Sequence, residues 1–203
     1  MEVFFAVLSF AFSSTIPPGP NNLMMLASGV NHGVKASLPH LLGICLGFPL
    51  MVLLVGLGFG AVFSQFPLLH SLIKWLGIAY LLYLAWLIAT SAPRALEGGH
   101  GKPFSFWQAA AFQWVNAKAW MMATGAIAAF TTVGGAVFLD VAQIVLAFFL
   151  MSFPCVGAWL VFGALLQNLL QTARAQRIFN GIMGLILVSS VVPMLVDEWR
   201  HWG

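Results

Sequence analysis

The chain has 203 residues, of which 61% are hydrophobic and only 6% are charged, and its mean hydropathy is +0.97. A soluble domain carries about 25% charged residues, so this composition excludes an ordinary soluble protein. The net charge of +3 is too small and too scattered to indicate nucleic-acid binding. We therefore expect an all-α integral membrane protein. A spanning helix needs roughly 20 apolar residues, so the length accommodates about six spans.

Runs with few or no charged residues predict where these six transmembrane helices lie. In chain order they cover about residues 3–30, 38–63, 72–90, 106–130, 138–166 and 178–196. The first run is interrupted by IPPGPNN at residues 16–22. We expect this Pro-Gly-Pro motif to break the first helix.

A break inside a membrane helix is costly, which makes its residues candidates for function. Proline in a helix interior removes a backbone hydrogen bond, and unpaired backbone in lipid costs several kcal/mol. Pro20 suits the first position of a new helix, and Asn21 and Asn22 add amides there. The free N–H groups and positive dipole end of that helix favour a carboxylate ligand. The alternative is a proline kink needed for packing, with the asparagines buried against neighbouring helices.

Basic residues in the loops predict the orientation of the chain. The loops after the first, third and fifth spans hold five basic residues, whereas the opposite side of the membrane carries only Arg200 and Lys74. We expect the side with the five basic residues to be cytoplasmic and both termini to be extracytoplasmic. The loops after the first, third and fifth spans hold Lys35, Arg94, Lys102, Arg174 and Arg177.

The two halves of the chain resemble each other weakly and in the same order. LMMLASG at Leu23 matches WMMATG at Trp120, and GFPL at 47–50 matches SFPC at 152–155. WLGIAYLL at Trp75 matches FNGIMGLI at Phe179. Three spans per half would insert the second half upside down. We predict one domain, residues 1–203, built from two inverted three-helix repeats at about 1–92 and 104–203.

Few polar residues lie within the predicted spans. Lys118 is an intramembrane cation, a type usually functional, that could bind a carboxylate or exchange protons; alternatively it snorkels to the interface. Asp140 starts the fifth span and could cap that helix or couple transport to protons. Lys74 and His40 are further proton-carrying candidates. Gln113 is expected to form a helix–helix hydrogen bond.

Enzymatic and metal-binding motifs are not apparent in the sequence. The five histidines show no metal-ligand spacing, and neither a nucleophile–base pair nor a phosphate-binding loop occurs. We expect no metal, no cofactor and no enzyme activity. Cys45 and Cys155, in corresponding spans, leave open a membrane thiol–disulfide electron-transfer protein. A passive pore lacks a selecting ring of charged or carbonyl groups.

Several segments together resemble one transporter family. PPGPNNLMMLASGVNHGVKAS followed by GICLGF closely resembles the opening of the LysE/RhtB family of bacterial amino-acid exporters. WLGIAYLLYLAWLIA and KPFSFWQAAAFQWVNAKAW resemble its third and fourth spans. SFW followed by FQWVNAK looks most like the cysteine/O-acetylserine exporter branch. The family pattern has Asn-Pro-Lys in span four. This chain has Asn116-Ala117-Lys118, which argues against a second helix break there.

The resemblance implies a function, a location and a set of site residues. It implies export of small amino acids of the cysteine/O-acetylserine, threonine or homoserine type across the bacterial inner membrane, driven by the proton motive force or by exchange. The implied partners are the amino-acid substrate and the lipid bilayer, with a possible homodimer. The residues carried over as substrate-binding are Pro18, Gly19, Pro20, Asn21, Asn22, Asn116 and Lys118.

Overall fold

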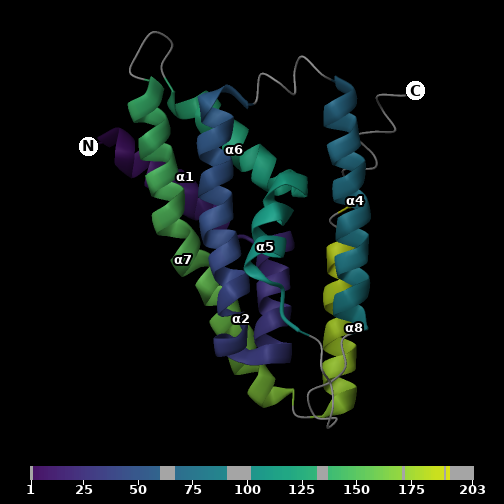
Figure 1. Cartoon of the computed structure of the whole chain (residues 1–203). Coiled ribbons are helices and arrows are strands. Elements are labelled where there is room, and N and C mark those ends of the chain that lie inside the picture. The colour runs from purple at the N-terminus through teal and green to yellow at the C-terminus, as the bar shows by residue number, and fades with distance from the viewer. Residues whose placement is uncertain are drawn as a thin grey trace.

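The computed structural model describes residues 2–59, 67–90, 102–131, 137–170, 172–189 and 191–192. Within these ranges every regular element is helical and no strand occurs, so the predicted all-α class is confirmed. Figure 1 shows the helices running mostly along one common direction. In chain order the elements are α1 (Glu2–Thr15), α2 (Pro20–Leu54), the π-helix η1 (Val55–Phe59), α4 (Pro67–Ala89), α5 (Phe106–Phe112), the 3₁₀-helix η2 (Gln113–Val115), α6 (Ala117–Phe130), α7 (Val137–Leu169) and α8 (Ala173–Ser189).

α2 consists of two arms that fold back on each other at Gly33. Gly33 has φ 76° and ψ 175°, a backbone conformation that a residue with a side chain rarely adopts. Asn22 and Phe48 line the same cavity although they lie on different arms, which shows that the chain reverses between them. The Oγ atoms of Ser28 and Ser37 lie 2.7 Å apart and tie the arms together. The sequence predicted a loop over residues 31–37, whereas one glycine makes the turn.

α7 packs along both arms of α2 and against α1. The first arm of α2 approaches it most closely where two glycines meet. A Cβ added to Gly163 would lie 2.2 Å from the carbonyl oxygen of Leu26, and one added to Gly29 would lie 2.4 Å from that of Leu160. Small residues that let helix backbones touch are the usual packing device of membrane helices. This crossing fixes α2 against α7.

The second arm of α2 uses the same device against α5 and the neighbouring helices. A Cβ on Gly43 would lie 2.4 Å from the oxygen of Phe106, and one on Gly47 would lie 2.7 Å from Cα of Ala110. In the segment GLGFG, a Cβ on Gly56 would lie 2.7 Å from Cγ1 of Val141. Gly43 and Gly47 therefore let α5 pack closely against the second arm of α2.

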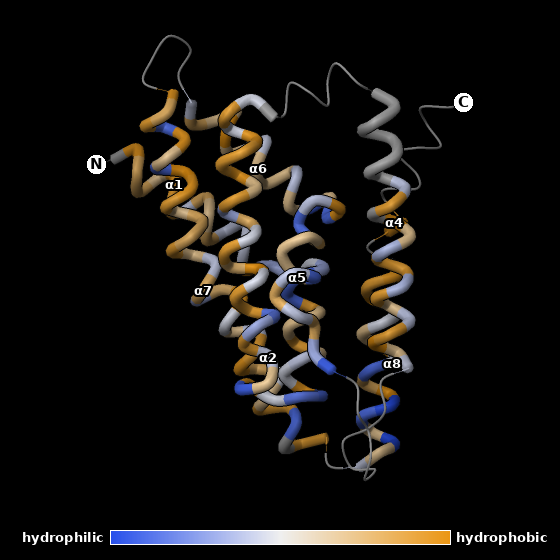
Figure 2. The backbone as a smooth tube through the Cα atoms, in the orientation of Figure 1, coloured by the Kyte–Doolittle hydropathy of each residue, from blue (hydrophilic) through white to orange (hydrophobic). Residues whose placement is uncertain are grey.

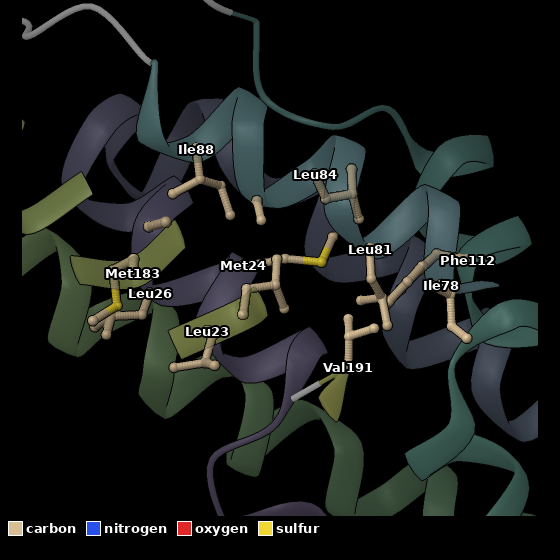
Figure 3. Close-up of a cluster of buried hydrophobic side chains, with 13 residues drawn as sticks. Leu23, Met24, Leu26, Ile78, Leu81, Leu84, Ile88, Phe112, Met183 and Val191 are labelled. Atoms are coloured by element: carbon tan, nitrogen blue, oxygen red, sulfur yellow. The ribbon is translucent and has the colours of Figure 1, made fainter. Parts of the chain in front are cut away.

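The main apolar cluster joins α4 and α8 to the first arm of α2. α4 and α8 lie side by side, and a Cβ on Gly184 would lie 2.8 Å from the oxygen of Ala85. Figure 3 shows side chains from the three helices converging, together with Phe112 of α5 and with Val191, which follows α8. The labelled members are Leu23, Met24, Leu26, Ile78, Leu81, Leu84, Ile88, Phe112, Met183 and Val191.

The distribution of polarity fits a membrane protein. Within the described ranges, two stretches are long and apolar enough to cross a membrane by length and composition, Pro20–Gly58 and Val137–Gln167. Figure 2 shows apolar residues along most of the helices and hydrophilic residues gathered where α2 turns and α8 begins. Lys35, Lys102, Arg174 and Arg177 belong to segments at this end, while Arg94, Arg200 and the side chain of Lys74 lie outside the described part of the chain.

Candidate functional site

The first helix break spans residues 16–19, between the end of α1 at Thr15 and the start of α2 at Pro20. Gly19 precedes α2 in an extended conformation and offers no side-chain cap. Pro20 occupies the first turn, where its missing N–H costs no hydrogen bond. The N–H groups at the start of α2 are consequently not capped by the residue before it.

Side chains from three helices satisfy the carbonyl groups that this break releases. Nδ2 of Asn22 donates to the carbonyl oxygens of Thr15 (2.8 Å) and Pro17 (2.9 Å). Nε1 of Trp159 in α7 donates to the carbonyl oxygen of Ile16 at 3.0 Å. Nζ of Lys118 in α6 donates to the carbonyl oxygen of Pro17 at 2.8 Å. The break is therefore a defined conformation held by named donors.

A second break interrupts the predicted fourth span, and the sequence expectation was wrong here. α5 ends at Phe112, η2 follows, and Asn116 has extended φ and ψ of −87° and 105° before α6 begins at Ala117. Proline is not required, because Oδ1 of Asn116 accepts a hydrogen bond from the backbone N–H of Lys118 at 3.1 Å and caps the new helix. Nε1 of Trp120 also donates to the oxygen of Trp114 across the break.

Two side-chain contacts join the breaks to each other. Asn21 and Gln113 exchange hydrogen bonds between their amides, at 2.9 and 3.2 Å, so the helix–helix role expected for Gln113 is confirmed. Lys118 reaches from α6 to Pro17, as described above. Its stem lies on Gly19, where an added Cβ would be 2.7 Å from Cδ of the lysine. The two interrupted helices therefore form one structural unit.

A small cavity of about 30 Å³ lies where the breaks meet. This is the space open to the centres of water-sized spheres, so the cavity has room for more than one water molecule, and it is partly open rather than sealed. The hydroxyl oxygen of Thr15 is buried and has no hydrogen-bond partner within the described structure. The cavity is lined by Thr15, Gly19, Asn21, Asn22, Ile44, Phe48, Asn116, Lys118, Ala119, Met122, Ser152 and Val156.

The electrostatic character of the cavity follows from its position. α2 and α6 both begin beside it, so two helix N-termini with their positive dipole ends meet there. Lys118 adds a full positive charge, and within the described chain it is the one charged residue of the lining. The wall formed by Ile44, Phe48, Met122 and Val156 is apolar. Such a cavity suits a carboxylate attached to a small apolar group.

The cavity brings together most of the residues singled out in the sequence. Gly19, Asn21, Asn22, Asn116 and Lys118 line it. Pro20 is buried beside it, whereas Pro18 is exposed and does not line it. Sequence reasoning missed two hydroxyl residues of the lining, Thr15 and Ser152. The only sequence signals were their positions, immediately before the first break and in the repeated segment SFPC.

Other polar candidates lie elsewhere. Asp140 lies in the first turn of α7 and does not line the cavity. His40 is fully buried against the ring of Phe104, 5.2 Å between centroids, and its ring nitrogens have no partner within the described structure. Cys45 and Cys155 are buried, free thiols. Among the described residues, no group of three metal-ligating side chains is present.

A model of the LysE type translocator family matches residues 12–197 of the chain. This chain belongs to the LysE family. Relatives of this LysE-family protein include proteins named cysteine/O-acetylserine efflux protein from Escherichia coli strain K12, Shigella flexneri and Shigella sonnei strain Ss046. Each is 37% identical over 126 residues, which cover 62% of this chain. The match spans 64% of each relative, less than two thirds of its length. No solved structure matches the chain.

Proposed function

We propose that this protein is a secondary transporter that exports small, uncharged amino acids from the cytoplasm across the bacterial inner membrane. The observation that carries the proposal is the meeting of two helix N-termini and Lys118 on one cavity. Secondary transporters commonly bind anionic groups of their substrates at the N-termini of interrupted helices. Membership of a translocator family supports the same class of function.

The substrate carboxylate is assigned to the polar side of the cavity. The N–H groups that begin α2 and α6 supply donors, and the ammonium group of Lys118 supplies the countercharge. Asn21 and Asn22 hold the break in place through their bonds to Gln113 and to the carbonyls of Thr15 and Pro17. Their amides therefore position the N-terminus of α2 rather than act first as ligands.

The apolar wall sets the class of side chain that the substrate carries. Ile44, Phe48 and Val156 offer no partner for a charged group, and burying an unpaired charge is strongly unfavourable. Thr15 and Ser152 offer hydroxyl groups to a polar but uncharged substituent. Together with the names of the relatives, this supports cysteine and O-acetylserine as substrates ahead of threonine and homoserine.

The proposed topology places six spans as two inverted repeats with both termini extracytoplasmic. The order of elements supports the repeat, since each half has an interrupted helix, a long helix and a further helix. α2 begins at Pro20 and α6 at Ala117, each three residues before the matched pair Leu23 and Trp120. The basic segments gathered at one end support the cytoplasmic assignment of that end.

Coupling to protons or to exchange is part of the proposal, with Lys118 and Asp140 as the candidate groups. Lys118 lines the cavity, so proton binding to its amine and substrate binding would affect each other. Asp140 lies in the first turn of α7, away from the cavity, and would bind and release protons at the start of that helix.

Accumulation of labelled amino acids in cells tests the function. Expression should lower the intracellular level of cysteine and O-acetylserine, should lower threonine less, and should leave lysine unchanged. A protonophore added to loaded cells separates proton coupling from exchange. Unchanged accumulation of every amino acid in the panel, with the protein present in the membrane, would contradict the proposal.

A further inference from the structure

The one charged group in the described cavity lining already donates a hydrogen bond to the protein itself. Nζ of Lys118 donates to the carbonyl oxygen of Pro17 at 2.8 Å, and its stem lies across Gly19. The cavity that Lys118 lines is small and partly open. A substrate carboxylate that pairs with Lys118 at this cavity therefore competes with the carbonyl oxygen of Pro17 for the ammonium group.

We propose that Lys118 is a switch residue whose ammonium group exchanges the carbonyl oxygen of Pro17 for the carboxylate of the substrate. The inference rests on the proposed function, because it takes the substrate to be an amino acid. Exchange is favourable because a carboxylate carries a full negative charge and a carbonyl oxygen does not. Loading the cavity then releases the end of α1 from α6.

The remaining contacts of the break determine what this release does. Pro17 keeps its hydrogen bond from Asn22 at 2.9 Å, and Ile16 keeps its bond from Trp159 at 3.0 Å. The break loosens towards α6 and stays attached to α2 and α7. The buried hydroxyl of Thr15, which has no partner within the described structure, gains one when the substrate is present.

In this switch the substrate carboxylate both binds Lys118 and triggers the release of the end of α1. A ligand with the same side chain and ammonium group but no carboxylate leaves Lys118 bound to Pro17. Substrate selection and movement of the first helix are thereby joined at one side chain.

Hydrogen exchange at the last turn of α1, followed by mass spectrometry on the purified full-length protein, tests the switch. The amide of Ile16 donates to the oxygen of Phe12 in this turn, so its exchange reports release. O-acetyl-L-serine should speed exchange there by about tenfold, the factor expected for losing a hydrogen bond to a charged group. O-acetylethanolamine, which lacks the carboxylate, should leave it unchanged.

Variants separate the switch from a purely structural lysine. Lys118→Ala without ligand should show the fast exchange of the loaded wild type. Lys118→Gln keeps a neutral donor for Pro17, so it should exchange slowly and fail to respond to O-acetyl-L-serine. Lys35→Gln, at an exposed residue outside the cavity, is the matched control and should respond like the wild type.

The outcomes distinguish this inference from the proposed function. Binding of labelled O-acetyl-L-serine or L-cysteine with unchanged or slower exchange at the end of α1 overturns the switch and leaves the export proposal standing. Absence of binding of both amino acids, and of transport of any amino acid in the panel, overturns both. A response of Lys118→Gln equal to that of the wild type also overturns the switch.

Discussion

Thr15 is a cavity residue whose side-chain hydroxyl the fold itself does not use. The preceding hydroxyls of Ser13 and Ser14 both donate to the carbonyl oxygen of Phe10 in their own helix. The hydroxyl of Thr15 has no partner and is buried at the cavity. The sequence SST at 13–15 presents three similar side chains. Only the rotation of α1 decides which of them faces the cavity, so the sequence could not single it out.

Replacing Thr15 by valine should separate substrate binding from folding. Valine has nearly the same shape and lacks the hydroxyl, which forms no hydrogen bond within the described fold. The melting temperature should therefore stay unchanged or rise slightly. The KM for export should rise by about threefold to tenfold, the value of one lost hydrogen bond. Export kinetics and thermal unfolding of the same preparation measure the two effects.

The control for this change is Ser13→Ala, an exposed position on the same helix. It should alter neither KM nor the melting temperature. A Thr15→Val protein with wild-type KM would show that the hydroxyl does not contact the substrate.

At the scale of elements, the two helix breaks show which signals a sequence carries. The first break was predicted because three prolines and a glycine interrupt an apolar run, with a packing kink as the alternative. The second was not, since it depends on Asn116, an ordinary capping residue, rather than on proline. The turn at Gly33 was predicted as a loop, because a positive φ at a single residue leaves no compositional trace.

Ala117→Pro should be tolerated and should modestly stabilise the protein. Ala117 is the first residue of α6, where proline fits, and Asn116 already has the extended conformation that a residue before proline adopts. The expected gain is about 0.4–1 kcal/mol, from a less flexible unfolded chain. Thermal unfolding compares this variant with Ala123→Pro, inside α6, which should prevent folding. Loss of folded Ala117→Pro protein would contradict the geometry of this helix start.

Gly163→Ala should prevent α2 and α7 from packing. The added Cβ would lie 2.2 Å from the carbonyl oxygen of Leu26, a backbone atom that cannot move aside alone. The expected cost is about 1–3 kcal/mol or more, as for other overpacked sites. The measurement is the yield of monodisperse protein after extraction and its melting temperature.

The comparison for this prediction lies on the same helix. Gly157→Ala meets open space, so it should leave both the yield and the melting temperature unchanged. Equal behaviour of the two variants would show that the glycine crossing does not hold the helices together.

At the scale of the whole molecule, composition was enough to predict the all-α class, whereas the inverted repeat stays a prediction. The matches of Leu23 with Trp120 and of the segments around them aligned the helix that follows each break. The pairing of Asn21 with Gln113 and of Lys118 with Pro17 could not be predicted from the sequence, because it depends on how each helix is rotated about its axis. Sequence periodicity is weak where nearly every residue is apolar.

Replacing both Cys45 and Cys155 by alanine should leave export intact. Both thiols are buried and unpaired by a disulfide, and buried cysteine commonly serves as a small apolar residue. A thiol–disulfide electron carrier would lose all activity in this variant. Efflux of labelled substrate, normalised to the amount of protein in the membrane, decides between them, and loss of efflux at normal protein level would favour the electron carrier.

The positive charge at the cavity has a consequence for the energy economy of the cell. A path that conducts protons through a membrane protein needs an unbroken file of water or exchangeable groups. Lys118 and the N-termini of α2 and α6 place positive charge on the cavity, and such charge excludes protons and other cations from a water-filled passage. If the protein exports amino acids as proposed, this charge would let cells hold it in quantity without draining the gradient that powers their other pumps.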